Sequence, residues 1–389
     1  MHPFLGKSIR KKKMKKKIVG LMLAVLMVFA VFAGCAAPAE ESVTPASSES
    51  DGEKASAEPT ASQEAPASAE GEAKADGSGL TFAFIVPGLD ANWYVEIADS
   101  FKYAAEEVGA EVMILPSDYD VDKEVANIDL CVTEQVDGLC MFSFNENGAA
   151  LAAKKMQEAG IPLIVPDSVG QALNKGADLA ACVDFDWEEM GHMYADWMAE
   201  NTTGDYVIIT GNFEHYPCIY VNKGMEDRSK ELGKNNLIDI RDADYNPDKA
   251  AAAAEDLING GLEFETIFVM QEEMAAAVVR VLKNAGKLNN PYKVISQNGQ
   301  EMGIEMIKSG DMQMTISSSP GLEGYICFRM LYSQQQGKID YKNEQKMVPI
   351  TAVTQADTEN IDPKVIIPWH RDPIFKELTA EFFPELMWY

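Results

Sequence analysis

The fold is decided by residues 80–116, which read LTFAFIVPGLDANWYVEIADSFKYAAEEVGAEVMILP. They begin with an apolar, β-rich run at 80–86. Apolar side chains from Tyr94 to Val108 then recur at three- and four-residue steps, which is typical of one helix face, and the helix is expected to end at Gly109. A second apolar run follows at 112–115. This order predicts a parallel strand–helix–strand unit.

The same alternation continues along the chain. Further helices are expected at 123–134, 147–159, 187–200, 223–232, 247–258, 272–285 and 302–308. Further strands are expected at 138–142, 162–165, 206–210, 237–241, 266–270, 294–296 and 314–317. Two such series predict an α/β protein with two Rossmann-like lobes, each built on a parallel sheet with helices on both faces.

The N-terminus has the pattern of a processed segment. A basic cluster at 7–17 precedes an apolar stretch at 18–33, which is shorter than the roughly 20 residues of a membrane span. This pattern predicts a secretory signal peptide over residues 1–35. Cys35 follows Phe-Ala-Gly and so resembles the lipidated cysteine of the bacterial lipoprotein cleavage box. An uncleaved N-terminal anchor is the alternative, and both place the rest of the chain outside the cytoplasmic membrane.

Residues 36–78 are rich in Ala, Ser, Glu and Pro and contain almost no large apolar side chain. Such a segment cannot bury enough surface to offset its ordering entropy, so we expect a disordered acidic linker. The folded part is then expected to begin at about Gly79.

Charge and cysteine content exclude several functions. The chain has 61 acidic and 33 basic residues, and eight of the basic ones precede Cys35, so nucleic acid is not an expected partner. The other five cysteines are odd in number and mostly lie in apolar runs, which favours buried thiols. A single disulfide among them is the alternative. No cysteine or histidine has metal-ligand spacing, and we expect neither a metal nor a cofactor.

Candidate site residues follow the strands, because parallel sheets bind ligands at the carboxyl ends of their strands. Aromatic, amide and carboxylate side chains are found there, and we select Asp90, Trp93, Tyr94, Asn145, Asp167, Tyr245, Gln271 and Asn298. Among strand-end positions the only histidine is His215, which is expected to be solvated, and no nucleophile and base are paired. The set favours stacking on and hydrogen bonding to a polar, uncharged ring.

Several segments together resemble the type I periplasmic binding proteins, specifically their sugar-binding branch. The similarity runs from residue 80 to about residue 360. It is carried by FIVPGLDANWYVEI at 84–97, DYDVDKEVANIDLCVTEQVDGL at 118–139, AGIPLIVPDS at 159–168, VMQEEMAAA at 269–277, VISQNGQEMG at 294–303 and MTISSSPGLEG at 314–324.

The resemblance implies two lobes that close on a small ligand, with crossovers near 184–186, 317–320 and 347–349. The lobes would comprise 79–185 with 319–347, and 186–318 with 348–389. The tail from 362 to 389 extends beyond the simplest members and is expected to pack on a lobe.

The resemblance also implies roles for individual side chains. Trp93 and Tyr94 would sandwich a sugar ring, Asp167 would bind its hydroxyls, and Tyr245 would be the aromatic contact of the second lobe. Further polar contacts would come from Asn222, Gln271, Asn298 and Ser318. Three structural alternatives stay open: either Tyr94 or Trp93 as a contact that only fixes the helix start, Asp167 as a turn cap and Tyr245 as a core residue.

Two departures from the family pattern bear on the ligand. Ser168 and the region of Val221 and Asn222 stand where the family has arginines that bind vicinal hydroxyls. We therefore expect a ligand other than ribose. A polyol, a deoxy or methylated sugar, a nucleoside and another cyclic compound remain open.

These observations predict a monomeric, lipid-anchored binding protein, not an enzyme, that delivers a sugar-like ligand to an ABC permease by hinge closure. A sensory receptor of the same fold, which presents its closed form to a membrane signalling protein, is the alternative. Trp187 and Trp197 are expected to pack their helix, and Glu272 and Glu273 to favour a helix N-terminus without touching ligand.

Overall fold

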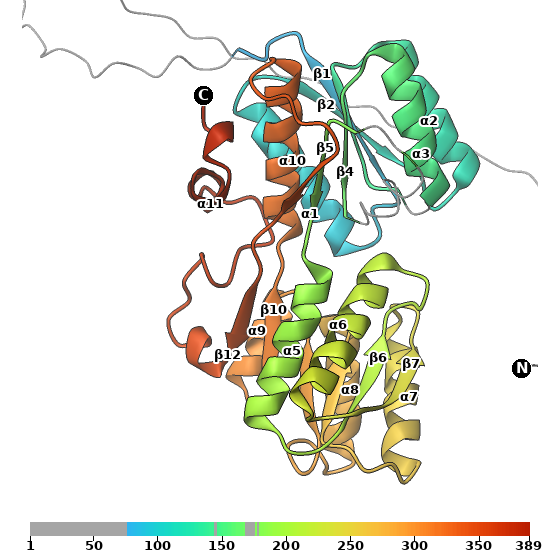
Figure 1. The fold of residues 1–389 in the computed structure, drawn as a ribbon, viewed down its shortest axis with the longest axis vertical. Coiled ribbons are helices and arrows are strands. Elements are labelled where there is room, and N and C mark those ends of the chain that lie inside the picture. Colours follow the sequence, from blue (N-terminus) through green and yellow to red (C-terminus); the bar gives the residue numbers. More distant parts are fainter. Residues whose placement is uncertain (1–75, 144–145, 168–175, 177–178) are drawn as a thin grey trace, which may run out of the picture. The chain divides into compact units, whose positions relative to one another are not determined.

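The computed structural model describes residues 76–143, 146–167, 176 and 179–389, which form two α/β lobes (Figure 1). The expected signal peptide with Cys35, almost all of the expected linker and Asn145 lie outside the described residues. Within the described ranges, no helix combines the length and apolar character that crossing a bilayer requires.

The first lobe is built on a six-stranded, wholly parallel sheet with the strand order β11-β5-β4-β3-β1-β2 in the described chain. Its strands are β1 (Thr81–Val86), β2 (Glu111–Pro116), β3 (Gly138–Met141), β4 (Leu163–Pro166), β5 (Ala181–Asp184) and β11 (Glu344–Met347). Its helices are α1 (Asn92–Glu106), α2 (Val121–Glu134), α3 (Glu146–Ala159) and α10 (Pro320–Gln335).

Strand β1 shows why both faces of this sheet are covered. Phe82 and Phe84 belong to the core cluster that includes α1 and α10, whereas Ala83 and Ile85 belong to the cluster that includes α2 and α3. Successive side chains of a strand point to opposite faces, so a continuous apolar run needs helices on both sides.

The second lobe repeats this architecture with the strand order β12-β10-β9-β8-β6-β7 in the described chain. Its strands are β6 (Tyr206–Thr210), β7 (Leu237–Asp242), β8 (Thr266–Val269), β9 (Lys293–Ser296), β10 (Met314–Ser317) and β12 (Thr351–Thr354). Its helices are α5 (Trp187–Asn201), α6 (Tyr216–Leu232), α7 (Pro247–Asn259), α8 (Glu272–Asn284), α9 (Glu301–Lys308) and the 3₁₀ turn η1 (Gln355–Thr358). Only the edge strand β12 is antiparallel among the described strands.

The chain passes between the lobes after β5, after β10 and after β11. These passages run from Asp184 to Trp187, from Ser317 to Pro320 and from Met347 to Thr351. The expected fold class, two parallel-sheet lobes joined by three crossovers, is therefore confirmed.

Helices α6 and α10 differ from the sequence prediction. Helix α6 begins at Tyr216, seven residues before the expected 223, and Pro217 occupies its first turn. Helix α10 was not predicted, because every side chain from Pro320 to Ser333 is buried and the helix has no polar face to produce a periodic pattern.

The C-terminal tail covers α10 of the first lobe. It forms α11 (Ile374–Phe382) and η2 (Pro384–Leu386), and both contact α10 (Figure 1). The ring of Trp388 stacks on Tyr332 with centroids 5.6 Å apart. Strand β12 pairs with β10 of the second lobe, whereas residues 374–389 pack on α10 of the first lobe and so differ from the expected assignment of 348–389 to the second lobe.

Between η1 and α11 the tail runs beside the β10–α10 crossover. The Ile367 N–H donates to Ser317 Oγ over 3.1 Å, and the Ser319 hydroxyl donates to the Pro368 carbonyl. A Cβ at Gly321 would lie 2.1 Å from the Trp369 carbonyl oxygen, so only glycine permits this close approach. The tail therefore forms a fourth passage between the lobes.

All five cysteines of the described residues are free and buried, as expected from their apolar surroundings. Burial raises the pKa of the Cys131 thiol to about 12, so this group stays protonated at neutral pH. The cysteines act as small apolar side chains.

Candidate ligand-binding site

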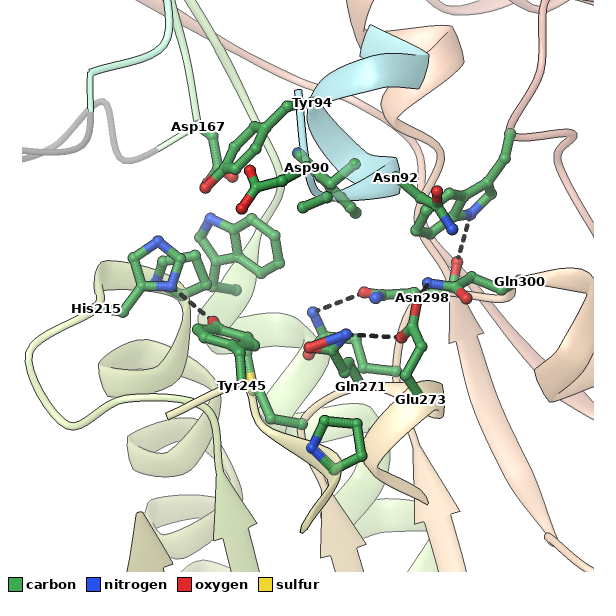
Figure 2. Close-up of a pocket in the computed structure, with 18 of the residues that line it drawn as sticks. Asp90, Asn92, Tyr94, Asp167, His215, Tyr245, Gln271, Glu273, Asn298 and Gln300 are labelled. Carbon is green, nitrogen blue, oxygen red and sulfur yellow. Dashed lines mark hydrogen bonds between the residues drawn. The ribbon is translucent and has the colours of Figure 1, made fainter. Parts of the chain in front are cut away.

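A cavity of about 490 Å³ lies between the two lobes, with walls contributed by both (Figure 2). Its size is typical of small-molecule sites. The structure brings seven of the predicted residues to its surface: Asp90, Trp93, Tyr94, Asp167, Tyr245, Gln271 and Asn298. The carboxyl ends of the strands therefore meet at one place, as parallel sheets require.

Trp93 and Tyr94 lie in the first turn of α1 and line the cavity. Trp93 packs edge to face on Phe185, with ring centroids 5.8 Å apart, and its indole N–H has no hydrogen-bond partner among the described residues. Tyr94 packs edge to face on Phe142 at 5.1 Å. Both rings therefore contact core aromatics and also reach the cavity.

Asp90 and Asp167 place negative charge beside Tyr94 (Figure 2). Burial raises the pKa of the Tyr94 hydroxyl well above its usual value, and electrostatic interactions with the neighbouring Tyr119, Asp167 and Asp90 raise it further. Asp167 is only 4% exposed and has a left-handed backbone, with φ of 48°.

The two lobes contribute the same turn to the cavity. Residues 117–123 read SDYDVDK and residues 243–249 read ADYNPDK. In each, the Asp-Tyr pair is left-handed, with φ between 50° and 56°. The next residue, Asp120 or Asn246, accepts hydrogen bonds from two backbone N–H groups of the following helix, over 2.8 and 3.0 Å.

These turns present Tyr119 and Tyr245 to the cavity. The Tyr119 hydroxyl donates to Asp90 Oδ1 over 3.1 Å. Tyr245 lies on Gly211, where a Cβ would come within 2.3 Å of the ring carbon Cζ. The Tyr245 residue is 37% exposed, while its hydroxyl lies 2.6 Å from His215 Nδ1 and 3.2 Å from Cys218 Sγ. The tyrosine is therefore held by its hydroxyl, with part of its surface open.

The side chain of His215 lines the cavity, whereas the sequence predicted a solvated loop residue. Burial lowers the pKa of its imidazole to about 4, because desolvation disfavours the charged form. The ring is therefore neutral near pH 7 and serves as a hydrogen-bonding partner of Tyr245.

An amide network forms the wall contributed by the second lobe (Figure 2). Gln271 Nε2 donates to Glu273 Oε2 over 2.7 Å, and Gln300 Nε2 donates to Glu273 Oε1 over 2.9 Å. Gln297 is 3% exposed, and its Oε1 has no hydrogen-bond partner among the described residues. Glu273, expected to stay away from ligand, is part of the cavity surface.

Glu272 supports this wall from behind. Its Oε1 accepts from the Thr315 hydroxyl over 2.6 Å and from the Gly299 N–H over 2.7 Å. Complete burial raises the pKa of this carboxyl to about 8, a shift that these hydrogen bonds oppose. The contacts fix the loop that carries Asn298 and Gln300.

Two of the predicted residues are not brought to the cavity surface, and a third lies outside the described chain. Asn222 donates from Nδ2 to Thr210 Oγ1 over 3.0 Å and does not line the cavity. Ser318 is fully buried in the β10–α10 crossover. Asn145 lies outside the described residues.

Several residues that line the cavity were not predicted as site residues from the sequence: Asn92, Tyr119, Trp187, His215, Glu273, Gln297, Gln300 and Trp369. Tyr119 could have been found, because it follows the second strand in a turn that repeats around Tyr245. Trp187 also lines the cavity, while its Nε1 donates to Asp184 Oδ1 over 2.7 Å. Trp369 comes from the tail, beyond the segments that carry the resemblance.

Carboxylates are the charged groups of the cavity surface. Asp90, Asp167 and Glu273 line it, whereas no lysine or arginine does within the described ranges. These ranges also hold no cluster of three His, Cys, Asp or Glu side chains that could bind a metal ion. The site can stack a ring and accept or donate hydrogen bonds around it.

Comparison with known proteins identifies the family. The family described as periplasmic binding protein domain matches residues 82–339, which is more than half of the chain. The chain therefore belongs to this family.

Two individual relatives show how similar the sequences are. The ribose import binding protein of Haemophilus influenzae is 27% identical over 254 residues, which cover 63% of this chain and 82% of that protein. The D-allose-binding periplasmic protein of Escherichia coli is 20% identical over 286 residues, which cover 70% and 92%.

Solved structures share the fold. An ABC transporter solute-binding protein from Bacillus halodurans with bound myo-inositol aligns with a TM-score of 0.66 and 20% identity, covering 74% of this chain and 99% of that one. A solute-binding protein from Burkholderia graminis in complex with D-arabinose aligns at 0.66 with 18% identity, covering 73% and 98%.

Proposed function

We propose that this chain is an extracytoplasmic solute-binding protein that captures a sugar or sugar-like molecule and delivers it to an ABC permease. The observation that carries the proposal is the cavity between the lobes, lined by tryptophan and tyrosine rings, amides and carboxylates from both. Its named relatives are binding proteins and not enzymes.

Hinge closure supplies the mechanism. A ligand that touches both walls favours the arrangement in which the lobes are close, so its differential affinity shifts the population toward that arrangement. Trp93 and Tyr94 from the first lobe and Tyr245 from the second then contact the ring, and Asp167, Gln271 and Asn298 contact its polar groups.

Lipidation of Cys35 is proposed to hold the protein at the outer face of the cell membrane, with residues 36–78 as a tether and the folded part acting as a monomer. The sequence around Cys35 supports this anchor. Cells expressing Cys35→Ser should release the protein from the membrane fraction and incorporate no labelled fatty acid into it. Retention of the lipid label would refute the anchor, and size-exclusion chromatography tests the monomer.

A thermal-shift screen against monosaccharides, polyols and nucleosides tests the binding function. A ligand at a hundred times its dissociation constant adds about 2.7 kcal/mol to the free energy of unfolding. Trp93→Leu should abolish the shift produced by any hit. The control is Trp197→Leu, which removes an indole of α5 that does not line this cavity. An unchanged shift in Trp93→Leu would exclude the ring from the site.

Transport is favoured over sensing because the curated relatives include proteins named for import. Deleting the gene should abolish uptake of the ligand found in the screen. Normal uptake combined with loss of a transcriptional response to that ligand would support the receptor instead.

A further inference from the structure

Negative charge enters the cavity from both lobes. Asp90 and Asp167 come from the first lobe and Glu273 from the first turn of α8. The described contacts of Asp90 and Glu273 are with neutral donors: the Tyr119 hydroxyl for Asp90, and the amides of Gln271 and Gln300 for Glu273. Neutral donors stabilise a carboxylate but leave its charge in place.

The described lining carries no group of opposite charge beside Asp90 and Glu273. The lining contains no lysine or arginine in the described ranges, and the low pKa of His215 keeps its imidazole neutral near pH 7. The pKa of Tyr94 is raised by burial and by the negative charges of Asp167 and Asp90. The described wall of the cavity is thus electronegative around Asp90 and Glu273.

A neutral sugar would displace water from the carboxylates and replace it only with hydroxyl donors, which leave the negative charge unbalanced and so cost free energy. A cation would offset this cost. Aromatic rings favour the same ligand, since the faces of Trp and Tyr attract cations within about 6 Å, and Trp93, Trp187, Tyr245 and Trp369 all line the cavity.

A buried hydrogen-bond acceptor in the cavity wall independently favours a ligand that carries N–H donors. Gln297 is 3% exposed, lines the cavity, and its Oε1 has no hydrogen-bond partner among the described residues. An unsatisfied buried acceptor is costly, and an ammonium group provides three N–H donors and no acceptor.

From these observations we infer that the ligand is a cyclic, sugar-like molecule with a protonated amino group. This inference rests on the proposed function and changes the expected ligand from a neutral ring to a cationic one. The amine lies among the carboxylates, and the apolar face of the ring lies against the aromatic side chains.

Matched pairs of compounds test the inference. Glucosamine with glucose, galactosamine with galactose, and an amino-deoxy-inositol with myo-inositol would be titrated calorimetrically at mildly acidic pH, where the amines are protonated. At least one amine should bind about tenfold or more tightly than its hydroxyl counterpart. Equal or weaker binding of every amine would overturn the inference and leave the proposed function intact. No binding by any member of the panel would overturn the inference and count against the proposed function.

Two charge-removing variants locate the effect. Asp90→Asn and Glu273→Gln should each reduce the preference for the amine over its hydroxyl counterpart severalfold. Two variants are used because Glu273→Gln also alters the amide network. The control is Glu214→Gln, which removes an exposed carboxylate outside the lining. A preference that is equally reduced in Glu214→Gln, or unchanged in both cavity variants, would contradict the inference.

Discussion

Trp93 and Trp369 pack edge to face with their ring centroids 5.4 Å apart, which joins the first turn of α1 to the C-terminal tail at the cavity wall. Trp369 also donates from Nε1 to the backbone carbonyl of Asn298 in the second lobe, over 3.0 Å. One tail residue therefore contacts both lobes and the candidate ligand site.

We expect Trp369→Leu to weaken ligand binding about tenfold, because it removes an aromatic wall and the packing of Trp93. Isothermal titration with a hit from the thermal-shift screen measures the change. The control is Trp388→Leu, which removes a tail indole that stacks on Tyr332 and does not line the cavity. Equal losses of affinity in the two variants would show that the tail acts through stability alone.

Gly211→Ala should displace the ring of Tyr245 and weaken binding, because the added Cβ would lie 2.3 Å from that ring. We expect a loss of affinity of about tenfold with a smaller change in unfolding temperature. Gly260→Ala, at the C-terminal end of α7 and outside the lining, is the matched control. Unaltered affinity in Gly211→Ala would mean that Tyr245 does not contact ligand.

Glu272 should make stability depend on pH. Its pKa is raised to about 8 in the folded protein from an ordinary value of 4.5. The unfolded state therefore releases this proton first, and the wild type loses stability relative to Glu272→Gln as pH rises from about 4.5 to 8. The difference amounts to about 1.4 kcal/mol per unit of pKa shift.

Urea denaturation of both proteins across this pH range measures the effect. Glu265 gives a contrast of opposite sign: its contacts with Lys293 and the N–H groups of Thr203 and Gly204 lower its pKa to about 2. The stability that Glu265 contributes should be present above pH 4.5 and lost as pH falls toward 2. A pH-independent difference between wild type and Glu272→Gln would contradict the Glu272 prediction.

Arg329 should hold the tail on the first lobe. It is fully buried, its Nη1 lies 3.2 Å from Glu107 Oε2, its Nη2 donates to the Leu386 carbonyl over 3.0 Å, and its guanidinium lies 4.1 Å from the centroid of Tyr389. Arg329→Met leaves these acceptors unsatisfied and should lower the free energy of unfolding by about 3 kcal/mol.

Amide hydrogen exchange in α11 should be faster in Arg329→Met than in the wild type. The control is Arg371→Met, which breaks only exposed ion pairs, such as the one to Asp99 at 3.6 Å, and should change stability by less than about 1 kcal/mol. Unchanged exchange in α11 after Arg329→Met would indicate that the aromatic contacts of Trp388 alone retain the tail.

The sequence predicted most of the fold because apolar runs and helical periodicity are local signals. The pattern around Phe101 in α1 is an example, since one face of that helix packs on the sheet while the other is solvated. Helix α10 gives no such signal, because it is buried on all sides. Its burial depends on the tail, and that contact joins residues far apart in the chain.

Some residues of the candidate site could be predicted from the sequence, and others could not. Trp93, Asp167 and Tyr245 could be predicted because each closely follows a strand, and strand ends converge in a parallel sheet. Trp369 follows no strand, and its position is set by hydrogen bonds between the tail and the β10–α10 crossover. Asn222 was assigned by family position alone, and its side chain contacts Thr210 instead of the cavity.

The tail segment between η1 and α11, which forms the fourth passage, restricts the rotation of one lobe relative to the other. Pro368 and its neighbours are hydrogen-bonded to Ser317 and Ser319, so the tail and the β10–α10 crossover must twist together. A pivot that runs along this pair of chains keeps those bonds, whereas a pivot at another crossover would shear them apart. We therefore expect closure of the lobes to occur about an axis that runs along this pair of chains.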